Sequence, residues 1–501
     1  MTIFIQGGRV LQGKSQTPER ADILIDKDRI SAVGNHPPVP EGAERIDAAG
    51  YFVLPGLINA HTHAHNNYMK GSADNWTLED LLNHGAALNS NRMVEDHYLS
   101  AAIGAVEMLK TGCTSAYDLF MAIPAPTDEG VEAVVQAYRD VGLRAVVAPA
   151  VADVVFYRTI PGFIDLLPPD LRQTVEKIQP PSTEALLQLT EAGIRKWNGI
   201  DNNRIRVGVA PTIPGQCSDA FLMGGLRLMQ EYGVGIHTHL VETKIQALYG
   251  WQRWGKSVTA HLHEIGLLGP KFVGAHGVWL TPEDIQRLAD TGSFIAHNPA
   301  SNLKLGSGIA PIKELLDSGV QVGLGCDGSM SSDNQNLFES MRFAAMVGKI
   351  RFPHRVNRWI GAEDVWNMVT RGSAGVLGMA EEIGTIEAGR KADLMLMKDD
   401  SVFLKPLNNF INALNYAETG ADVDTVLVDG KVVMKKGRII TVDEERLRTR
   451  AQERIEQLHQ GNAASWSVAE RLSPFIAEAC QKVVAMPFAI NRYAASTESR
   501  P

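Results

Sequence analysis

The sequence contains few cysteines, and their positions argue against a disulfide framework or a cysteine-rich zinc site. Only four cysteines occur in 501 residues, they are widely scattered, and no CxxC pair is present. Disulfide-dependent domains and structural zinc sites instead place their cysteines at close, paired spacings. We therefore expect reduced thiols in a cytoplasmic protein.

The sequence also lacks a run of lysine and arginine and any long uninterrupted apolar stretch. Lysine and arginine number 48 against 57 acidic residues, for a formal net charge of -9. An acidic excess argues against nucleic acid or an anionic membrane as a partner. No apolar run approaches the ~20 residues that span a bilayer, and the opening MTIFIQGGRVL lacks the pattern of a secretory signal. We expect a soluble protein with no membrane or nucleic-acid partner.

The sequence does contain a long alternation of apolar runs and helical patterns between about residues 55 and 385. Helical patterns such as 94–112, 219–233 and 282–292 separate the apolar runs. Eight such units predict a (β/α)8 TIM barrel, whose chemistry lies at the C-terminal ends of its strands. A doubly wound open sheet is the alternative, but no GxGxxG follows any of these runs. The predicted strands are Val53–Ile58, Cys113–Tyr117, Leu143–Pro149, Ile205–Ala210, Gly235–Leu240, Lys271–Ala275, Phe294–Ala296 and Val320–Gly325.

Short strand-like segments flank this region on both sides. They fill residues 1–55 and 386–445, the second with a hairpin around Asp429-Gly430. Each part alone is too small to bury a good core. We predict one composite β-sandwich built from both ends of the chain, with the barrel of residues 56–385 inserted; two separate β appendages are the alternative. Residues 446–501 predict a helical extension, docked on the barrel or on a neighbouring subunit.

The stretch 53-VLPGLINAHTHAHNNYMKG-71 places two histidines at the end of the first predicted barrel strand. His61 and His63 are two residues apart, so on a strand their side chains point the same way and can reach one point in space. Two imidazoles alone hold a divalent ion weakly, and catalytic sites add further protein ligands. The remaining ligands must come from other strand ends.

Four later strand ends carry further residues of the metal-binding or acid–base type. A barrel brings its strand ends together, so their side chains are candidates for one site. These residues are His239 and Glu242 on the fifth strand, His276 on the sixth, His297 on the seventh and Asp327 on the eighth.

The joint pattern resembles the amidohydrolase superfamily, in particular its hydrolytic deaminase and triazine-hydrolase branch. The resemblance rests on HTH after PGLINA, HLVE on the fifth strand, His on the sixth, HNPASNLKLGSG on the seventh and Asp after the eighth. GTIEAGRKADLMLM is similar to the segment where these proteins return to their β-sandwich. The resemblance covers residues 1 to 445.

Position by position, the resemblance implies that one divalent metal ion is bound by His61, His63, His239 and Asp327. This set of ligands suits zinc, with iron as the alternative. His237 shares the side-chain parity of His239, so spacing alone leaves it open, whereas the family motif favours the histidine followed by Leu-Val-Glu.

Two further observations bear on the number of metal ions. His65 is in register with the first histidine pair, and we interpret it as a wall of the pocket. Binuclear amidohydrolases use a modified lysine at the end of the fourth strand, where this chain reads 205-IRVGVAPTIPGQ-216 without a lysine. The sequence therefore favours one metal ion.

The resemblance also implies catalytic roles for Glu242, His276 and Asp327. A metal ion would lower the pKa of its bound water toward ~7 and make hydroxide available for attack on a ring carbon. Asp327 would accept a proton from that water, Glu242 would protonate a ring nitrogen, and His276 would hydrogen-bond the attacking oxygen. We therefore expect an amidohydrolase acting on the carbon–nitrogen bond of a cyclic amidine, a deaminase that releases ammonia from an amino-substituted N-heterocycle.

The substrate is less well defined by the sequence. Adenosine-type relatives carry a histidine just after the fourth strand and an acidic residue after the HTH loop; this chain has Thr212-Ile213 and 88-LNSNRM-93 there. Both departures argue against a nucleoside or S-adenosylhomocysteine substrate. Candidate substrate contacts on the loops over the barrel mouth are Tyr68, Trp76, Phe156, Tyr157, Arg158, Gln216, Trp279, His297 and Asn302.

Two other functions compete with deamination. One is a hydrolase that expels chloride or an alkylamine from a triazine-like ring, and the other is a non-catalytic barrel scaffold. Retention of all four ligands with Glu242 and His276 argues against the scaffold. The relatives further imply a homo-oligomer, a dimer or larger.

Overall fold

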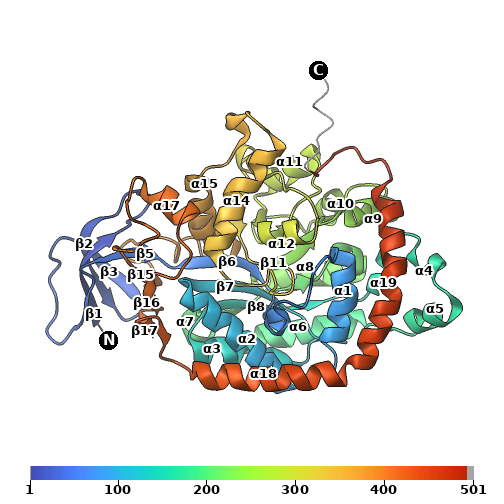
Figure 1. The fold of residues 1–501 in the computed structure, drawn as a ribbon, viewed down its shortest axis with the longest axis horizontal. Coiled ribbons are helices and arrows are strands. Elements are labelled where there is room, and N and C mark those ends of the chain that lie inside the picture. The colour runs from blue at the N-terminus through green and yellow to red at the C-terminus, as the bar shows by residue number, and fades with distance from the viewer. Residues whose placement is uncertain (1, 494–501) are drawn as a thin grey trace.

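The computed structural model describes residues 2–493 and places a β-sheet unit at one end of a larger α/β body (Figure 1). The sheet has nine strands in the order β18-β17-β16-β15-β5-β1-β2-β3, with β4 paired to β1. Buried side chains from both ends of the chain, including Ile23, Leu394 and Leu427, share one core. The prediction of a β unit composed of both chain ends is confirmed. Its strands are β1 (Thr2–Val10), β2 (Glu19–Asp26), β3 (Arg29–Gly34), β4 (Glu44–Asp47), β5 (Tyr51–Pro55), β15 (Leu394–Lys398), β16 (Val423–Val428), β17 (Lys431–Lys435) and β18 (Arg438–Ile439).

The predicted first barrel strand, Val53–Ile58, is wrong in its bounds, because that run contains parts of two strands. Residues up to Pro55 belong to β5, which pairs with β15 in the sheet unit, and the barrel strand is β6 (Leu57–Thr62). Gly56 joins them at a close approach, since a Cβ atom there would lie 2.2 Å from the Thr114 side chain. A continuous apolar run cannot show where the chain passes from one sheet to another.

The other seven predicted strands match strands around the barrel, with the fourth split in two. The strands form two parallel sheets, β10-β8-β7-β6 with β9 beside β8, and β11-β12-β13-β14. Parallel bridges between Val209 and Ile236 and between Thr62 and Asp327 join the two sheets into a closed barrel. The barrel strands after β6 are β7 (Cys113–Phe120), β8 (Arg144–Val151), β9 (Ile205–Val207), β10 (Ala210–Pro211), β11 (Ile236–Leu240), β12 (Phe272–His276), β13 (Phe294–His297) and β14 (Gln321–Leu324).

Helices surround the barrel, and their ends carry the expected signals. For example, α11 begins with a capping box at Thr281 and Asp284 and ends at the left-handed Gly292. Within residues 2–493 no helix has both the length and the hydropathy to cross a membrane. The helices before the C-terminal extension are α1 (Leu78–Leu88), α2 (Val94–Lys110), α3 (Asp128–Val141), α4 (Phe163–Leu166), α5 (Pro169–Glu176), α6 (Thr183–Trp197), α7 (Ile200–Asn203), α8 (Asp219–Tyr232), α9 (Lys244–Trp254), α10 (Val258–Glu264), α11 (Pro282–Thr291), α12 (Pro299–Lys304), α13 (Ile312–Asp317), α14 (Leu337–Arg351), α15 (Ala362–Asn367), α16 (Ser373–Val376) and α17 (Phe410–Tyr416).

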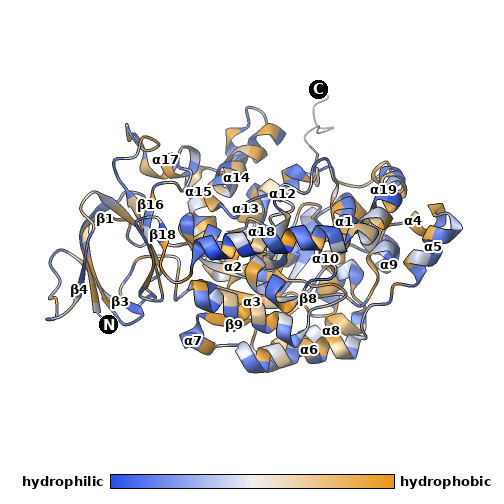
Figure 2. Ribbon diagram, turned by 60° about the horizontal axis from the view of Figure 1, so that its bottom comes forward, coloured by the Kyte–Doolittle hydropathy of each residue, from blue (hydrophilic) through white to orange (hydrophobic). Residues whose placement is uncertain are grey.

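The two C-terminal helices dock on the barrel of their own chain. α18 (Glu444–Gly461) runs along α2, where Arg454 forms a buried ion pair with Asp96 at 2.8 Å. Its outer face is strongly hydrophilic (Figure 2). α19 (Ala463–Val484) then turns upward beside α1, α4 and α9 (Figure 1). The chain divisions at residues 55, 385 and 445 stay predictions.

A buried ion-pair network joins the barrel to the sheet unit. Arg144, at the start of β8, donates to Asp393 Oδ2 at 2.7 Å and to Asp429 Oδ1 at 3.0 Å, and its side chain is 1% exposed. Lys391 donates to the same Asp429 oxygen at 3.0 Å. The charges of two cations and two carboxylates are thus paired in a buried interface between the barrel and the sheet unit.

We expect Arg144→Ala to lower the free energy of unfolding by about 3–5 kcal/mol, because it leaves Asp393 without its buried cation and takes one of two cations from Asp429. Urea-induced unfolding followed by circular dichroism measures the change. Arg139→Ala is the matched control: its pair with Asp201 is about one third exposed, so we expect a loss of at most ~1 kcal/mol. Equal losses in the two variants would contradict the role of the buried network.

Candidate active site

Four side chains of the metal-binding type meet at the C-terminal end of the barrel. The ligand atoms of His61, His63, His239 and Asp327 all lie within 4.8 Å of one another, and all four residues are buried. The His63 and His239 Nε2 atoms are 3.1 Å apart. Asp327 Oδ1 lies 3.4 Å from His61 Nε2 and 3.2 Å from His63 Nε2. Side chains from three distant parts of the chain therefore surround one point.

Closure of the barrel brings Asp327 to the histidine pair. The bridge between Thr62 and Asp327 joins β6 to the end of β14, and the Asp327 N–H donates to the His61 carbonyl at 2.9 Å. His61 and His63 flank Thr62, so both project from the same side of the strand. Asp327 has a positive φ of 63°, a conformation that aspartate tolerates better than most residues and that recurs at functional sites.

Backbone carbonyls orient two of the imidazoles. His63 Nδ1 lies 2.8 Å from the Leu119 carbonyl oxygen, and His239 Nδ1 lies 2.5 Å from the Thr212 carbonyl oxygen. An Nδ1–H that donates to a carbonyl leaves the Nε2 lone pair facing the cluster, as in many metal sites. The Ser331 hydroxyl donates to Asp327 Oδ2 at 2.9 Å. These contacts hold the ligand atoms in place.

The protonation states of three of the four side chains suit a divalent cation, whereas Asp327, against the effect of burial, raises the pKa of His63. Burial lowers the pKa of His61 to about 3 and holds that of His239 well below its usual value, so both rings are neutral. Although burial opposes ionisation of Asp327, His61 and His63 lower its pKa well below the usual value. Neither ring nitrogen of His61 has a hydrogen-bond partner. Unpartnered buried nitrogens beside an ionised carboxylate fit a metal ion, which accepts neutral imidazoles and deprotonated carboxylates.

Glu242 and His276 adjoin this cluster. Glu242 Oε2 lies 3.7 Å from His276 Nε2, while Glu242 Oε1 has no hydrogen-bond partner. Burial, with the nearby carboxylates of Asp327 and Glu79, raises the pKa of Glu242 well above its usual value. A buried, protonated carboxyl group is suited to donate a proton.

His276 is fixed by an asparagine. Its Nδ1 lies 2.8 Å from Asn302 Oδ1, so Nδ1–H donates there, and Nε2, 4.0 Å from Asp327 Oδ2, faces the cluster. His276 also has a positive φ of 70°. The side chain is thus held rigidly with one nitrogen directed at the site.

A cavity of about 500 Å³ opens onto the cluster. His63, His239, Glu242 and Asp327 lie in its wall, with His65 beside them, as a wall residue would. The volume is in the range of pockets that bury small organic ligands. Of the loop residues predicted to contact substrate, three lie in the wall: Phe156, Tyr157 and Gln216.

The other predicted contacts are not among the residues of the cavity wall. Asn302 binds His276, and both ring nitrogens of His297 are buried without a partner. Trp76 stacks on His84 at 4.4 Å, and Arg92 lies over the Tyr68 ring. Trp279 donates to the Ser307 carbonyl, and Arg158 is exposed. Loop position alone therefore does not identify residues that face the cavity.

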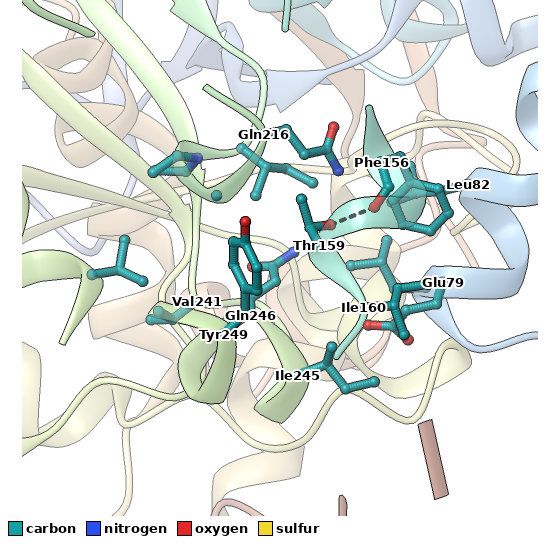
Figure 3. Close-up of a pocket in the computed structure, with 15 residues that line it drawn as sticks. Glu79, Leu82, Phe156, Thr159, Ile160, Gln216, Val241, Ile245, Gln246 and Tyr249 are labelled. Atoms are coloured by element: carbon teal, nitrogen blue, oxygen red, sulfur yellow. Dashed lines mark hydrogen bonds between the residues drawn. The ribbon is translucent and has the colours of Figure 1, made fainter. Parts of the chain in front are cut away.

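A second, much smaller cavity of about 20 Å³ has Val241, which precedes Glu242 in the chain, in its wall, and Figure 3 shows its lining. Glu79, which the sequence analysis missed, lines it and accepts a 2.9 Å hydrogen bond from Thr243. Gln246 accepts from the Glu242 N–H at 2.8 Å, and Gln216 lines both cavities. No sequence motif marks Glu79, because its position depends on how α1 packs over the barrel.

His237 lies outside the four-residue cluster. Its ring is 4.9 Å from that of His61 and 4.6 Å from that of Tyr117, measured between centroids, and neither nitrogen has a partner. The structure thus places His239, not His237, among the four converging ligand atoms.

A closed parallel barrel with three imidazoles and a carboxylate at its C-terminal end defines a metal-dependent hydrolase type of site. Residues 52–433 match the model of the amidohydrolase family, and the chain belongs to that family.

Several proteins are similar to this chain over most of its length. It is 33% identical to a 5-methylthioadenosine/S-adenosylhomocysteine deaminase of Caldanaerobacter subterraneus subsp. tengcongensis, over 88% of this chain and 95% of the relative. It is 31% identical to a 5'-deoxyadenosine deaminase of Methanobrevibacter smithii, over 92% and 99%. The structure of an atrazine chlorohydrolase from Arthrobacter aurescens TC1 complexed with zinc superposes with a TM-score of 0.82 at 27% identity, covering 90% of this chain and 100% of that one.

Proposed function

We propose that this protein is a metal-dependent hydrolytic deaminase that replaces an amino group on an N-heterocycle by a hydroxyl and releases ammonia. The convergence of His61, His63, His239 and Asp327 next to a buried Glu242 carries this proposal. Relatives at 31–33% identity that are named deaminases support it.

We assign the four converging side chains to one divalent cation, zinc, with iron as the alternative. When bound, such an ion acts as a Lewis acid that makes water nucleophilic at neutral pH. The solved relative that contains zinc supports this assignment. Within residues 2–493, no second group of three or more histidine, cysteine or acidic side chains has converging ligand atoms.

The remaining steps belong to the chain's own residues. His276 holds the attacking water through Nε2, and Asp327 accepts a proton from it. Glu242 gives its proton to a ring nitrogen, which makes the adjacent carbon electrophilic. The water oxygen bonds to that carbon, and the bond from the carbon to the exocyclic amino group then breaks. The amine leaves as ammonia with the proton that Asp327 took up, and a proton of the product returns to Glu242, so that one water is consumed for each ammonia formed.

A screen for ammonia release tests this function. Metal-replete protein is incubated with a small library of aminopurines, aminopyrimidines and aminotriazines. We expect ammonia from at least one ring class. Release of chloride or an alkylamine from substituted triazines, without ammonia from any ring, would instead support the second candidate, which the structural similarity to the atrazine chlorohydrolase favours. Absence of bound metal and of any turnover would support the scaffold.

We expect His237→Phe to keep the bound metal, because His237 lies outside the cluster, and His239→Phe to lose it. Metal content after dialysis, measured by plasma mass spectrometry, compares the two variants. Both residues lie on β11 and are buried, so the substitutions are matched in size and place. Loss of metal from His237→Phe with retention in His239→Phe would reverse the assignment.

We further propose that the protein acts in the cytoplasm as a homo-oligomer. All four cysteines are buried and unpaired, which suits a reducing compartment. Analytical ultracentrifugation tests the oligomer, and a single monomeric species at micromolar concentration would contradict it.

A further inference from the structure

The C-terminal helix α19 lies outside the part of the chain that matches the family, yet it forms part of the wall of the large cavity. The family match ends at residue 433, whereas α19 spans Ala463–Val484. Ser465, Val468 and Ala469 of this helix line the cavity together with side chains of α1 and the loop after β8. This part of the wall therefore comes from beyond the segment that matches the family model.

Buried polar contacts hold α19 in this position. Asn83 of α1, 2% exposed, donates to the Ala469 carbonyl at 2.9 Å and accepts from the Tyr157 hydroxyl at 2.8 Å. Asn462, between α18 and α19, donates to the Ser90 carbonyl at 3.0 Å. One buried asparagine thus links three sides of the cavity, and a second fixes the corner from which α19 starts.

The chemistry of the lining restricts the substrate. Among residues 2–493 the cavity wall contains no lysine or arginine, and its acidic side chains are Glu242 and Asp327 at the reaction centre. Away from that centre the wall is mainly apolar, with Leu81, Ile123 and Val468 from three separate segments. A charged substituent would lose its hydration there without gaining a partner.

The size of the cavity also indicates a substrate larger than a single ring. About 500 Å³ suits a drug-sized ligand, and this is more room than a single heterocyclic ring fills. Burying apolar area against Leu81 and Val468 would be favourable for an alkyl or thioalkyl group.

We propose that α19 determines substrate specificity, and that the substrate is an amino-substituted heterocycle with an uncharged, apolar substituent that packs against Val468 and Ala469. The inference rests on the proposed function, because the ring is placed at the metal cluster. Beyond that function, the inference specifies the chemistry of the substituent, the part of the substrate that lies away from the reacting atoms.

Binding to metal-replete Glu242→Gln protein, measured by calorimetry, tests this without requiring turnover. The probes are two pairs of a bare and a substituted ring: melamine with N-isopropylmelamine, and adenine with 9-propyladenine. We expect the substituted member of at least one pair to bind about tenfold more tightly, as for one or more methylene groups in an apolar pocket. If neither substituted compound binds more tightly than its bare ring, the inference is overturned.

Two further variants locate the substituent. In the same background Val468→Trp is expected to weaken the substituted probe about tenfold and leave the bare ring unchanged, whereas Ser467→Trp, on the exposed side of α19, leaves both unchanged. Val468→Lys is expected to improve binding of a ring carrying a carboxylate substituent, a gain that misfolding cannot produce. Unchanged binding of the substituted probe by Val468→Trp, or no gain with Val468→Lys, would contradict the inference.

These binding results are separable from the proposed reaction. If the substituted probes bind as expected and no ammonia is formed by the wild-type protein, deamination fails and the role of α19 stands. If ammonia is formed but Val468→Trp has no effect on binding, the role of α19 fails and deamination stands.

Discussion

Glu242→Gln is expected to lower kcat at least ~100-fold while leaving the metal content near that of the wild type. This is the lower end of what general acid–base groups contribute. The amide has nearly the same shape as the carboxyl group but has no acidic proton to give to a ring nitrogen. Glu242 is not one of the four converging side chains, so the bound ion is expected to remain.

We would measure kcat by steady-state kinetics with the best substrate from the ammonia screen. Metal analysis of the same protein gives its metal content. Glu283→Gln is the control, because Glu283 is an exposed carboxylate at the start of α11, and it is expected to behave as the wild type. Unchanged turnover in Glu242→Gln would remove this residue from the mechanism. Loss of metal would show that its role is to support the ligands.

Asp327→Ala is expected to abolish activity and to weaken metal retention. The substitution removes the only anionic member of the four-residue cluster. It also removes the group that would accept a proton from water. We expect the loss of metal affinity to exceed the ~10–100-fold that follows loss of a residue supporting a ligand.

Metal retention is measured as the metal content after dialysis against a weak chelator. The loss of activity is measured before and after addition of zinc. Asp290→Ala, at an exposed aspartate of α11, is the matched control and is expected to keep both metal and activity. Asp327→Asn removes the negative charge but keeps a side-chain oxygen that can bind the metal. We expect it to retain more metal than Asp327→Ala. A fully metallated and active Asp327→Ala protein would rule out the ligand assignment.

Much of the fold could be predicted because its signals are local. The alternation of apolar runs and helical patterns predicted the barrel, and seven of its eight strands lie within a few residues of their predicted positions. The exception is the run around Gly56, where β5 ends in one sheet and β6 begins in another. Hydrophobicity is the same on both sides of that junction, so it could not reveal the change of partner.

The candidate site could be predicted in part, for a similar reason. His61, His63, His239 and Asp327 occupy strand ends, and a barrel places strand ends together. The loop residues were harder, since Phe156 lines the cavity and Trp279 does not, although both follow strands. Which way a loop side chain points depends on its neighbours in space.

The sequence by itself determined the element types and the chemistry available at each strand end, because side-chain periodicity and residue type act over a few positions. Only the tertiary structure decided that Asp327 bonds to the backbone of His61, that Glu79 bonds to Thr243 next to Glu242, and that α19 lines the cavity. Each of these depends on barrel closure or helix docking between segments far apart in the chain, and such contacts leave no pattern in the local sequence.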